Sequence, residues 1–265
     1  MFQLTPMVKN ILIANIGIYI LNSLLSLNLA GIFGVHYIFS DNWMIFQYVT
    51  YMWFHSTSSF WHVLGNMFAV LVFGPMLERV WGSKKFLTFY LITGIGAGLL
   101  YGVADTIEKN DLRSDTQKFI SNPNADDFYF FVHEHAKGYD IVSLTDFADE
   151  YYDHSDDTFY ENQAVSYVTQ IYDSVSDIPM IGASGAVFGI LLAFAMLFPN
   201  VELMLLFPPI PIKAKYMVFA YGAYELYQEI NRNGADNVAH FAHLSGMLIG
   251  FLLLKYWARN GKGLY

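Results

Sequence analysis

Residues 60–103 read FWHVLGNMFAVLVFGPMLERVWGSKKFLTFYLITGIGAGLLYGV. Two apolar runs, 60–77 and 86–103, flank a short segment, 78–85, that contains all four charged residues of this stretch. A run of about 18 or more apolar residues with few charges is long enough to cross the hydrocarbon core of a bilayer as a helix. The stretch therefore predicts two membrane-spanning helices joined by a tight, basic hairpin.

The composition of the whole chain agrees with a membrane protein. Of its 265 residues, 55% are hydrophobic and 14% are charged, so the apolar fraction lies above, and the charge below, the values typical of soluble globular proteins. The chain contains no cysteine, which excludes disulfides, thiolate nucleophiles and thiolate zinc sites. Any covalent chemistry therefore has to use serine, threonine, lysine, tyrosine or a carboxylate.

Similar apolar runs predict four further spans. The first begins after Lys9 and ends near Leu29, and we expect it to be retained because it is longer than a signal-peptide core and has no small-residue cleavage site. The others cover about 184–198, 216–230 and 238–257, the middle one being interrupted by Glu225, Gln228 and Glu229. The sequence thus predicts an all-α, polytopic membrane protein with a bundle of six transmembrane helices.

The distribution of basic residues orients the six spans, because Lys and Arg prefer the cytoplasmic ends of membrane helices. With the N-terminus in the cytoplasm, Arg232 and the four bases of residues 105–177 lie outside, whereas these bases lie inside: Lys9, Arg79, Lys84, Lys85, Lys213, Lys215, Lys255, Arg259 and Lys262. We therefore expect both termini in the cytoplasm. Residues 30–59 are too polar and turn-rich for a buried helix and are expected to form a structured loop in the membrane interface.

A long acidic segment separates the third and fourth spans. Residues 105–177 hold 17 Asp and Glu but four Lys and Arg, a local net charge of −13, whereas the remainder carries +4. The chain lacks a basic stripe, which excludes nucleic-acid binding. We divide it into spans 1–3 (1–104), an acidic extracytoplasmic insertion (105–178) and spans 4–6 (179–265). The many aromatic residues of the insertion predict a partly helical subdomain rather than full disorder.

One group in the insertion has a spacing that metal sites use. His133 and His135 flank Glu134, and these side chains could hold a cation. A solvated acidic helix or loop with incidental histidines explains the same residues, and we favour that interpretation. No metal and no cofactor is predicted.

Polar side chains recur at three places within the predicted spans. His62 and Asn66 lie at the start of the second span, Ser184 opens the fourth, and His243 lies in the sixth. Polar groups in hydrocarbon need partners, so their recurrence indicates a built site. A serine hydroxyl becomes a strong nucleophile when a base takes its proton, and His243 is the natural base in this chain. Ser184 and His243 are therefore the candidate catalytic pair.

Small residues allow the fourth and sixth spans to approach closely. Gly185 and Gly189 lie four residues apart on one helical face, and so do Gly246 and Gly250. Helix packing alone also explains each glycine pair. The close approach is what a contact between the serine and the histidine requires.

Donors for a developing oxyanion are predicted around Ser184. Gly182 permits a tight turn before the helix, which leaves free backbone N–H groups at the helix N-terminus. His62 and Asn66 share one helical face and can add side-chain donors. For either residue alone, a hydrogen bond to a neighbouring helix is the simpler explanation.

The surroundings of His243 predict a catalytic dyad. Phe188 is one turn after Ser184, so its ring is expected beside the serine and against the His243 imidazole, although a lone aromatic is more often core filler. No carboxylate is expected to orient the imidazole, because Asp236 lies near the membrane edge and Glu225 lies on another span. A dyad has lower catalytic power than a triad, whose third member fixes the imidazole tautomer.

The motifs Gly182-Ala183-Ser184-Gly185, Ala242-His243-x-x-Gly246-x-x-x-Gly250 and His62-x-x-x-Asn66 resemble those of the rhomboid family of intramembrane serine proteases. The resemblance extends to Glu78 with Gly82-Ser83 and to residues 211–215, and it covers nearly everything except the insertion. The chain departs from the family at Phe188, where Tyr is common, and at Phe46-Gln47, where many members have Trp-Arg. The second departure puts a stabilising loop interaction of the family in question.

The resemblance implies a role for each candidate residue. Ser184 would be the nucleophile and His243 the general base and then acid, and the Ser184 backbone N–H would form the oxyanion hole with His62 and Asn66. The residues that would pack around this site are Phe188, Gly182, Gly185, Gly246 and Gly250.

The activity implied by the resemblance is hydrolysis of a peptide bond in or near a transmembrane helix of another protein. Its partners would be substrate transmembrane segments and the lipid bilayer. Independently of the resemblance, the retained first span and the absence of an Arg- and Ser-rich transit peptide favour a bacterial cell (inner) membrane as the location. The alternative is a catalytically inactive rhomboid-like protein that binds clients, although the chain keeps both the serine and the histidine. A channel or transporter with a polar pathway is a third interpretation and explains the Gly-Ala-Ser-Gly helix start less well. The sequence does not indicate an oligomeric state.

Overall fold

The structure is a computed structural model that describes residues 3–25, 27–136, 138–204, 209–231 and 238–260. Within these ranges the chain is mostly helical, with one antiparallel pair of short strands in which Glu202 lies opposite Lys213. The elements follow in the order α1 (Pro6–Leu24), α2 (Ala30–Phe33), α3 (Gln47–Thr50), the 3₁₀ turn η1 (Tyr51–Trp53), α4 (Phe60–Glu108), α5 (Asn110–Ser121), α6 (Ala125–His135), α7 (Ile141–Asp153), α8 (Thr158–Ser176), α9 (Ser184–Leu197), β1 (Glu202–Met204), β2 (Pro211–Lys213), α10 (Ala214–Ile230) and α11 (His240–Arg259).

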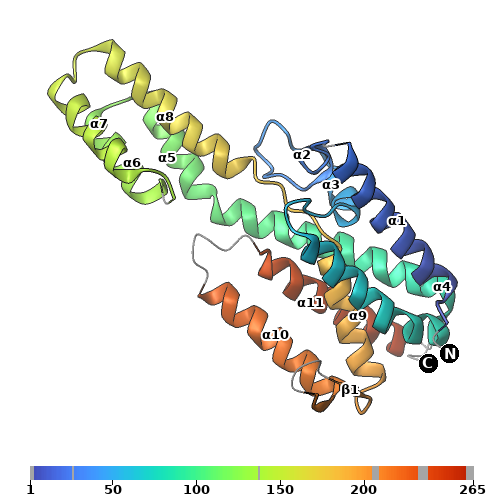
Figure 1. Ribbon diagram of the computed structural model, residues 1–265. Coiled ribbons are helices and arrows are strands. Elements are labelled where there is room, and N and C mark those ends of the chain that lie inside the picture. Colours follow the sequence, from blue (N-terminus) through green and yellow to red (C-terminus); the bar gives the residue numbers. More distant parts are fainter. Residues whose placement is uncertain (1–2, 26, 137, 205–208, 232–237, 261–265) are drawn as a thin grey trace.

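Helices α1, α4, α9 and α11 form a bundle around one apolar core, and α10 lies against α9 and α11 (Figure 1). Helix α9 is central, because it contacts α4, α10 and α11. Its sequence, SGAVFGILLAFAML, is apolar on all sides, and nearly all of its side chains are buried. Such a sequence is typical of a helix enclosed by others. The position of its first residue, Ser184, is thus fixed by packing against several neighbours.

Three described helices, α1, α4 and α11, are long and apolar enough to cross a membrane, and α9 is a shorter apolar helix. Helix α4 has 49 residues and is divided at Gly82, whose φ of 76° is not helical. That φ lies in the left-handed region, which glycine adopts without steric cost. The segments on either side of Gly82 contain the two apolar runs that predicted the second and third spans.

Glu78 fastens α1 to the turn within α4. Its carboxylate accepts hydrogen bonds from the backbone N–H groups of Met7 and Val8, each at 2.9 Å. The hydroxyls of Thr5 and Ser83 also donate to it. The first N–H groups of a helix have no partner within the helix, and a negative charge there is favourable. The acidic residue of the predicted hairpin therefore orders the start of α1.

Helix α1 ends at Leu24, earlier than the predicted end of the first span near Leu29. The Asn22 side chain accepts a hydrogen bond from the Leu29 backbone N–H at 3.4 Å, and the Asn28 side chain accepts one from Gly31 at 3.3 Å. Asparagine side chains compete in this way with helical backbone bonds and favour turns.

Helix α4 runs to Glu108, past the predicted end of the third span at residue 103. Its last turns enter the segment that we assigned to the insertion. The buried Asp105 of this segment is paired with Lys109 at 2.9 Å, one turn further along. Because each charge has a partner four residues away, the helix can continue where the apolar run has ended.

The predicted structured loop, residues 30–59, is organised around the buried side chain of Gln47. Its amide oxygen accepts hydrogen bonds from the backbone N–H groups of His36 (3.3 Å) and Met44 (3.1 Å). Its amide nitrogen donates to the carbonyls of Ile32 (3.2 Å) and Asn42 (2.8 Å). The departure at Phe46-Gln47 therefore does not leave the loop without internal bonds.

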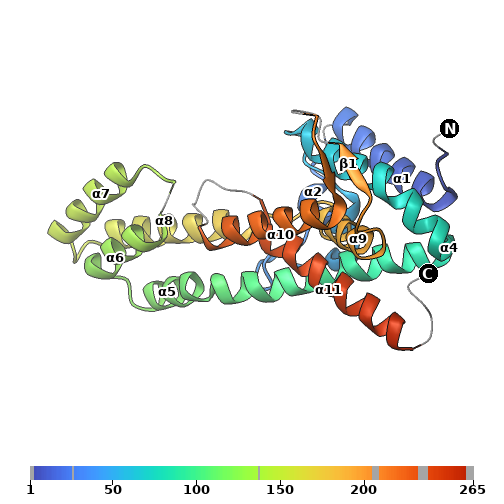
Figure 2. The same ribbon diagram turned by 90° about the horizontal axis from the view of Figure 1, so that it is seen from below.

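Helices α5 to α8 form a second helical unit, which extends away from the bundle in two perpendicular views (Figures 1 and 2). The partly helical fold predicted for these residues is present. The unit has an apolar core of its own, made by Leu112, Phe119, Ala125, Phe128, Phe131, Val132, Ala136, Leu144, Ala148, Tyr151, Ala164, Val168 and Ile171. None of these residues belongs to the core of the bundle.

Contacts with the loop 30–59 hold the base of this unit. The Arg113 guanidinium lies over the Phe39 ring, 3.8 Å from its centroid. Directly after α8, the Asp177 carboxylate accepts hydrogen bonds from the side chains of Ser40 (2.5 Å) and Asn42 (3.2 Å). The loop therefore contacts both α5 and the segment that follows α8.

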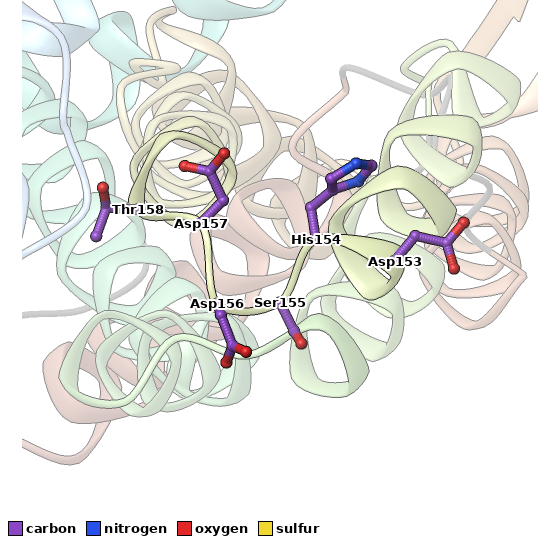
Figure 3. A pocket seen from close by; sticks show the side chains of 6 residues that line it. All are labelled: Asp153, His154, Ser155, Asp156, Asp157 and Thr158. Carbon is purple, nitrogen blue, oxygen red and sulfur yellow. The ribbon is translucent and has the colours of Figure 1, made fainter.

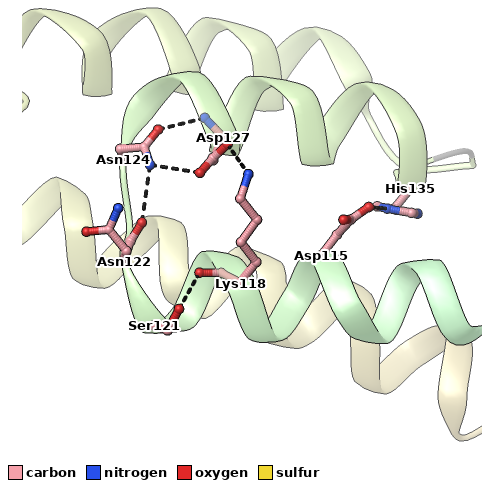
Figure 4. Close-up of polar contacts among 7 residues, drawn as sticks. All are labelled: Asp115, Lys118, Ser121, Asn122, Asn124, Asp127 and His135. Carbon is pink, nitrogen blue, oxygen red and sulfur yellow. Dashed lines mark hydrogen bonds and ion pairs between the residues drawn. The ribbon is translucent and has the colours of Figure 1, made fainter.

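A polar cluster on α5 and α6 gives the helical unit a dependence on pH. Lys118 donates to Asp127 at 2.9 Å, and Asn124 caps α6 through a bond from the Asp127 N–H and donates to its carboxylate (Figure 4). The Lys118 and Asn124 hydrogen bonds lower the pKa of Asp127 from its ordinary value of 3.8. A lowered folded-state pKa stabilises the folded unit above the unfolded-state value and loses that effect as the pH falls through the folded-state value.

We therefore expect Asp127→Asn to destabilise this unit at pH 5 by under about 1 kcal/mol, because the ion pair is largely exposed. The difference from wild type should shrink and vanish as the pH falls through the lowered pKa of Asp127, because the wild-type carboxylate is then itself protonated. Denaturant titrations at pH 5 and at successively lower pH, monitored by proteolysis within α5–α8, measure the stability of this unit in the variant and in wild type. Asp126→Asn, an exposed neighbour, is the control and should show no such difference.

Candidate functional site

The turn before α9 has a conformation that requires glycine. Gly182 has a φ of 127°, and its N–H donates to the Tyr51 carbonyl at 3.1 Å. A Cβ atom at this position would lie 2.6 Å from Nε2 of His62 and 3.7 Å from Oγ of Ser184. The His62 ring and the Ser184 hydroxyl are thus brought to the same turn, and Ser184 is the first residue of α9. The backbone N–H groups at a helix N-terminus lack helical partners, so they are available there.

His243 lies in the first turns of α11, where it is buried. Its imidazole stacks on the Phe188 ring of α9, with centroids 4.2 Å apart and planes inclined by 10°. The predicted contact between these two rings is therefore present. The Phe188 ring also contacts the Tyr221 ring of α10, with a centroid separation of 4.8 Å. Three helices thus meet around the histidine.

Glycines set the distance between α9 and α11. A Cβ atom at Gly246 would lie 1.9 Å from the Gly185 carbonyl oxygen, and one at Gly250 would lie 3.3 Å from the Gly189 Cα. The predicted close approach of the two helices through both glycine pairs is confirmed. Because Ser184 precedes Gly185 and His243 lies one turn before Gly246, both side chains are near this contact. The hydrogen bonds of the described residues do not include one between them, as is common before a substrate binds.

His62 and Asn66 lie one turn apart near the start of α4. The Asn66 amide donates to the His62 carbonyl at 3.0 Å, and Nδ1 of His62 accepts from the Ser56 N–H at 3.4 Å. The Nε2 edge of His62 therefore faces the turn at Gly182. Asn66 keeps a second amide N–H beyond the one given to its own helix.

Glu225 is the residue that the sequence argument excluded. Its Oε2 atom accepts a hydrogen bond from Nδ1 of His243 at 2.7 Å and another from Nδ1 of His240 at 2.6 Å. The expectation that no carboxylate orients His243 is wrong, because α10 packs against α11 and brings Glu225 to it. The sequence did carry a signal, since an ionisable residue within an apolar run needs a partner, and the nearest histidines in the chain are His240 and His243.

The same three side chains have the composition of a cation site. Their ligand atoms, from Glu225, His240 and His243, lie within 4.8 Å of one another. The separations of 2.6 and 2.7 Å are those of charge-assisted hydrogen bonds, in which a proton already joins each nitrogen to the oxygen. We therefore interpret the cluster as a hydrogen-bonded network.

The two histidines of α6 have separate partners. Nε2 of His135 pairs with Asp115 at 2.8 Å (Figure 4). Nε2 of His133 lies 3.1 Å from the Tyr129 hydroxyl. Local contacts therefore account for both rings.

Two surface hollows lie away from Ser184. One, of about 470 Å³, is lined by residues 153–158 of the connection between α7 and α8 (Figure 3). There Asp157 caps α8 by accepting from the Phe159 N–H at 2.8 Å, and His154 stacks on Tyr160. The other, of about 560 Å³, lies between the residues around α2 and the end of the acidic segment. Helix capping accounts for Asp157, and ring stacking accounts for His154.

The fold and the site define a helical membrane protein with a serine and a histidine on adjacent central helices. A rhomboid domain matches residues 42–109 and 159–260, so the chain belongs to the rhomboid family. The matched segments leave out residues 110–158, which contain α5, α6 and α7. No curated protein and no solved structure matches the chain.

Proposed function

We propose that the protein is an intramembrane serine endopeptidase that hydrolyses peptide bonds in or near transmembrane segments of membrane proteins. Rhomboid-family proteins are generally serine proteases that act on membrane-protein substrates. The observation that carries the proposal for this chain is the placement of Ser184 and His243 on helices that touch at Gly185 and Gly246.

In the proposed reaction the Ser184 hydroxyl attacks the scissile carbonyl while Nε2 of His243 takes its proton. The imidazolium then gives this proton to the leaving amine, and the acyl-enzyme remains. In the second half of the reaction His243 takes a proton from water, the water oxygen attacks the acyl carbonyl, and the imidazolium returns the proton to the Ser184 oxygen. Negative charge on the carbonyl oxygen is received by the Ser184 backbone N–H and by donors from His62 and Asn66. Losing one such donor typically lowers the rate by about 10² to 10³.

The proposal includes six spans with both termini in the cytoplasm and α5–α8 on the opposite side of the membrane. Support comes from the division of α4 at Gly82 and from the distribution of Lys and Arg. A bacterial inner membrane is the proposed location. A substrate helix hides its carbonyls in internal hydrogen bonds, so a segment has to unwind before Ser184 can attack it.

A serine-directed fluorophosphonate should label the detergent-solubilised protein, and a single-span reporter in liposomes should be cleaved. Ser184→Ala and His243→Ala should remove labelling and lower cleavage by at least about 10³-fold, because nucleophile and base act as a unit. Ser245→Ala, a buried serine on α11, is the matched control and should keep both activities. Equal labelling of the Ser184→Ala protein would contradict the mechanism. A folded wild type that neither reacts nor cleaves but retains bound clients would support the inactive, client-binding alternative.

A further inference from the structure

We propose that Glu225 is a positioning residue that holds His243 with Nδ1 protonated and Nε2 free to accept the Ser184 proton. The site would then be a Ser184–His243–Glu225 triad rather than a dyad. This inference rests on the proposed function and adds to it the orientation of the base.

The contact between Glu225 and His243 fixes the tautomer of the imidazole. An ionised carboxylate can only accept hydrogen bonds, so the proton of the 2.7 Å contact lies on Nδ1 of the histidine. In a neutral imidazole, Nε2 is then the unprotonated nitrogen. It lies on the ring edge away from α10, and only in this tautomer can it accept a proton from a serine.

The orientation of the ring is restrained a second time by Phe188. Stacking at 4.2 Å and 10° limits tilting of the His243 plane, while the Glu225 bond limits rotation within that plane. One restraint comes from α9 and the other from α10. The imidazole is therefore held before substrate arrives, and such preorganisation lowers the cost of reaching the reactive geometry.

His240 explains how a carboxylate is kept in this apolar setting. It lies one turn before His243 on α11, and its Nδ1 donates to the same Glu225 oxygen at 2.6 Å. Glu225 is 2% exposed, so a charge there needs hydrogen-bond partners. With two donors on one oxygen, the carboxylate is fixed and cannot turn away from His243.

A role in helix packing alone is the competing explanation, because the network also joins α10 to α11. Both roles predict that removing the carboxylate lowers stability. The two roles differ in the activity and in the His243 tautomer that they predict for the molecules that remain folded. A packing role alone requires neither a particular tautomer nor a particular base strength of His243.

The test compares Glu225→Gln with wild type in the full-length protein, counting only folded molecules by reporter-binding stoichiometry. We expect kcat to fall by about 10² to 10⁴, with KM changed less than threefold, because the amide can stabilise the wrong tautomer and lacks the negative charge. Glu225→Asp should restore part of kcat. Glu229→Gln, one turn further on α10, is the matched control and should keep kcat.

Nitrogen NMR of ¹⁵N-histidine-labelled protein gives a readout that packing does not move. Wild-type His243 should carry its proton on Nδ1, and Glu225→Gln should shift the population towards Nε2. Unchanged kcat and tautomer in folded Glu225→Gln would overturn the inference while leaving Ser184 labelling, and so the proposed function, intact. Loss of activity with a zinc chelator and its return with zinc would also overturn it, since the three side chains would then be metal ligands.

Discussion

Gly246→Ala should abolish proteolysis and destabilise the bundle. The new Cβ would lie 1.9 Å from the Gly185 carbonyl oxygen, 2.7 Å from the carbonyl carbon and 3.0 Å from its Cα. All three atoms belong to the backbone of α9, so no side-chain rotation can relieve the clash. The helices have to separate, yet α4 packs against both of them.

The expected size of the effect follows from packing and from geometry. Inserting a methyl group into a close-packed interior typically costs about 1 to 3 kcal/mol, and a backbone clash belongs at the upper end or beyond. A displacement of about 1 Å between reacting groups lowers a rate by about 10². Cleavage of a liposome reporter and thermal unfolding in detergent measure the two quantities. We expect a rate loss of at least about 10²-fold, together with a lower Tm.

Alanine substitutions at two other glycines provide a comparison for Gly246→Ala. A Cβ at Gly250 would meet the Phe89 ring at 3.2 Å and the Gly189 Cα at 3.3 Å, so Gly250→Ala should cost less than Gly246→Ala. Gly17 on α1 has nothing within 4 Å of such an atom, and Gly17→Ala should be neutral or slightly stabilising. Wild-type rate and Tm in Gly246→Ala would show that α9 and α11 are not held together at this point.

The parts of the site that the sequence predicts share a local signal. Ser184 comes two residues after Gly182 at the start of an apolar run, and the Gly246 and Gly250 spacing places a small-residue face on the helix that carries His243. In each case, the glycines that position the side chain lie within a few residues of it in the sequence. Residue type and spacing are then sufficient to predict the close approach.

Glu225 could not be placed in the same way, because its partner lies on another helix. Periodicity describes one helix at a time and does not state which face of α10 meets α11. Its charge, together with Gln228 and Glu229, instead reads as an interruption of a span. In the structure Glu225 instead points into the bundle, where His240 and His243 donate hydrogen bonds to its carboxylate. Gln47 is similar, since its four bonds reach backbone groups scattered through a loop.

The helical unit α5–α8 is predicted by composition only as partly ordered. Its aromatic content indicates a core, but the arrangement depends on which rings meet. Phe128 of α6 is fully buried and lies against Phe119 of α5, Phe147 and Tyr151 of α7 and Tyr167 of α8, with centroids 5.4 to 6.4 Å apart. A single ring therefore links all four helices.

Phe128→Ala should unfold this unit while the bundle stays folded. Removing a fully buried phenylalanine costs about 3 to 5 kcal/mol, a large part of the stability of about 5 to 15 kcal/mol that a domain possesses. Hydrogen exchange should show loss of protection in α5–α8 and retained protection in α9 and α11, because the two cores share no residue. Phe130→Ala, an exposed ring on the same helix, should change exchange little. Simultaneous loss of protection in α9 and α11 would show instead that both cores unfold as one cooperative unit.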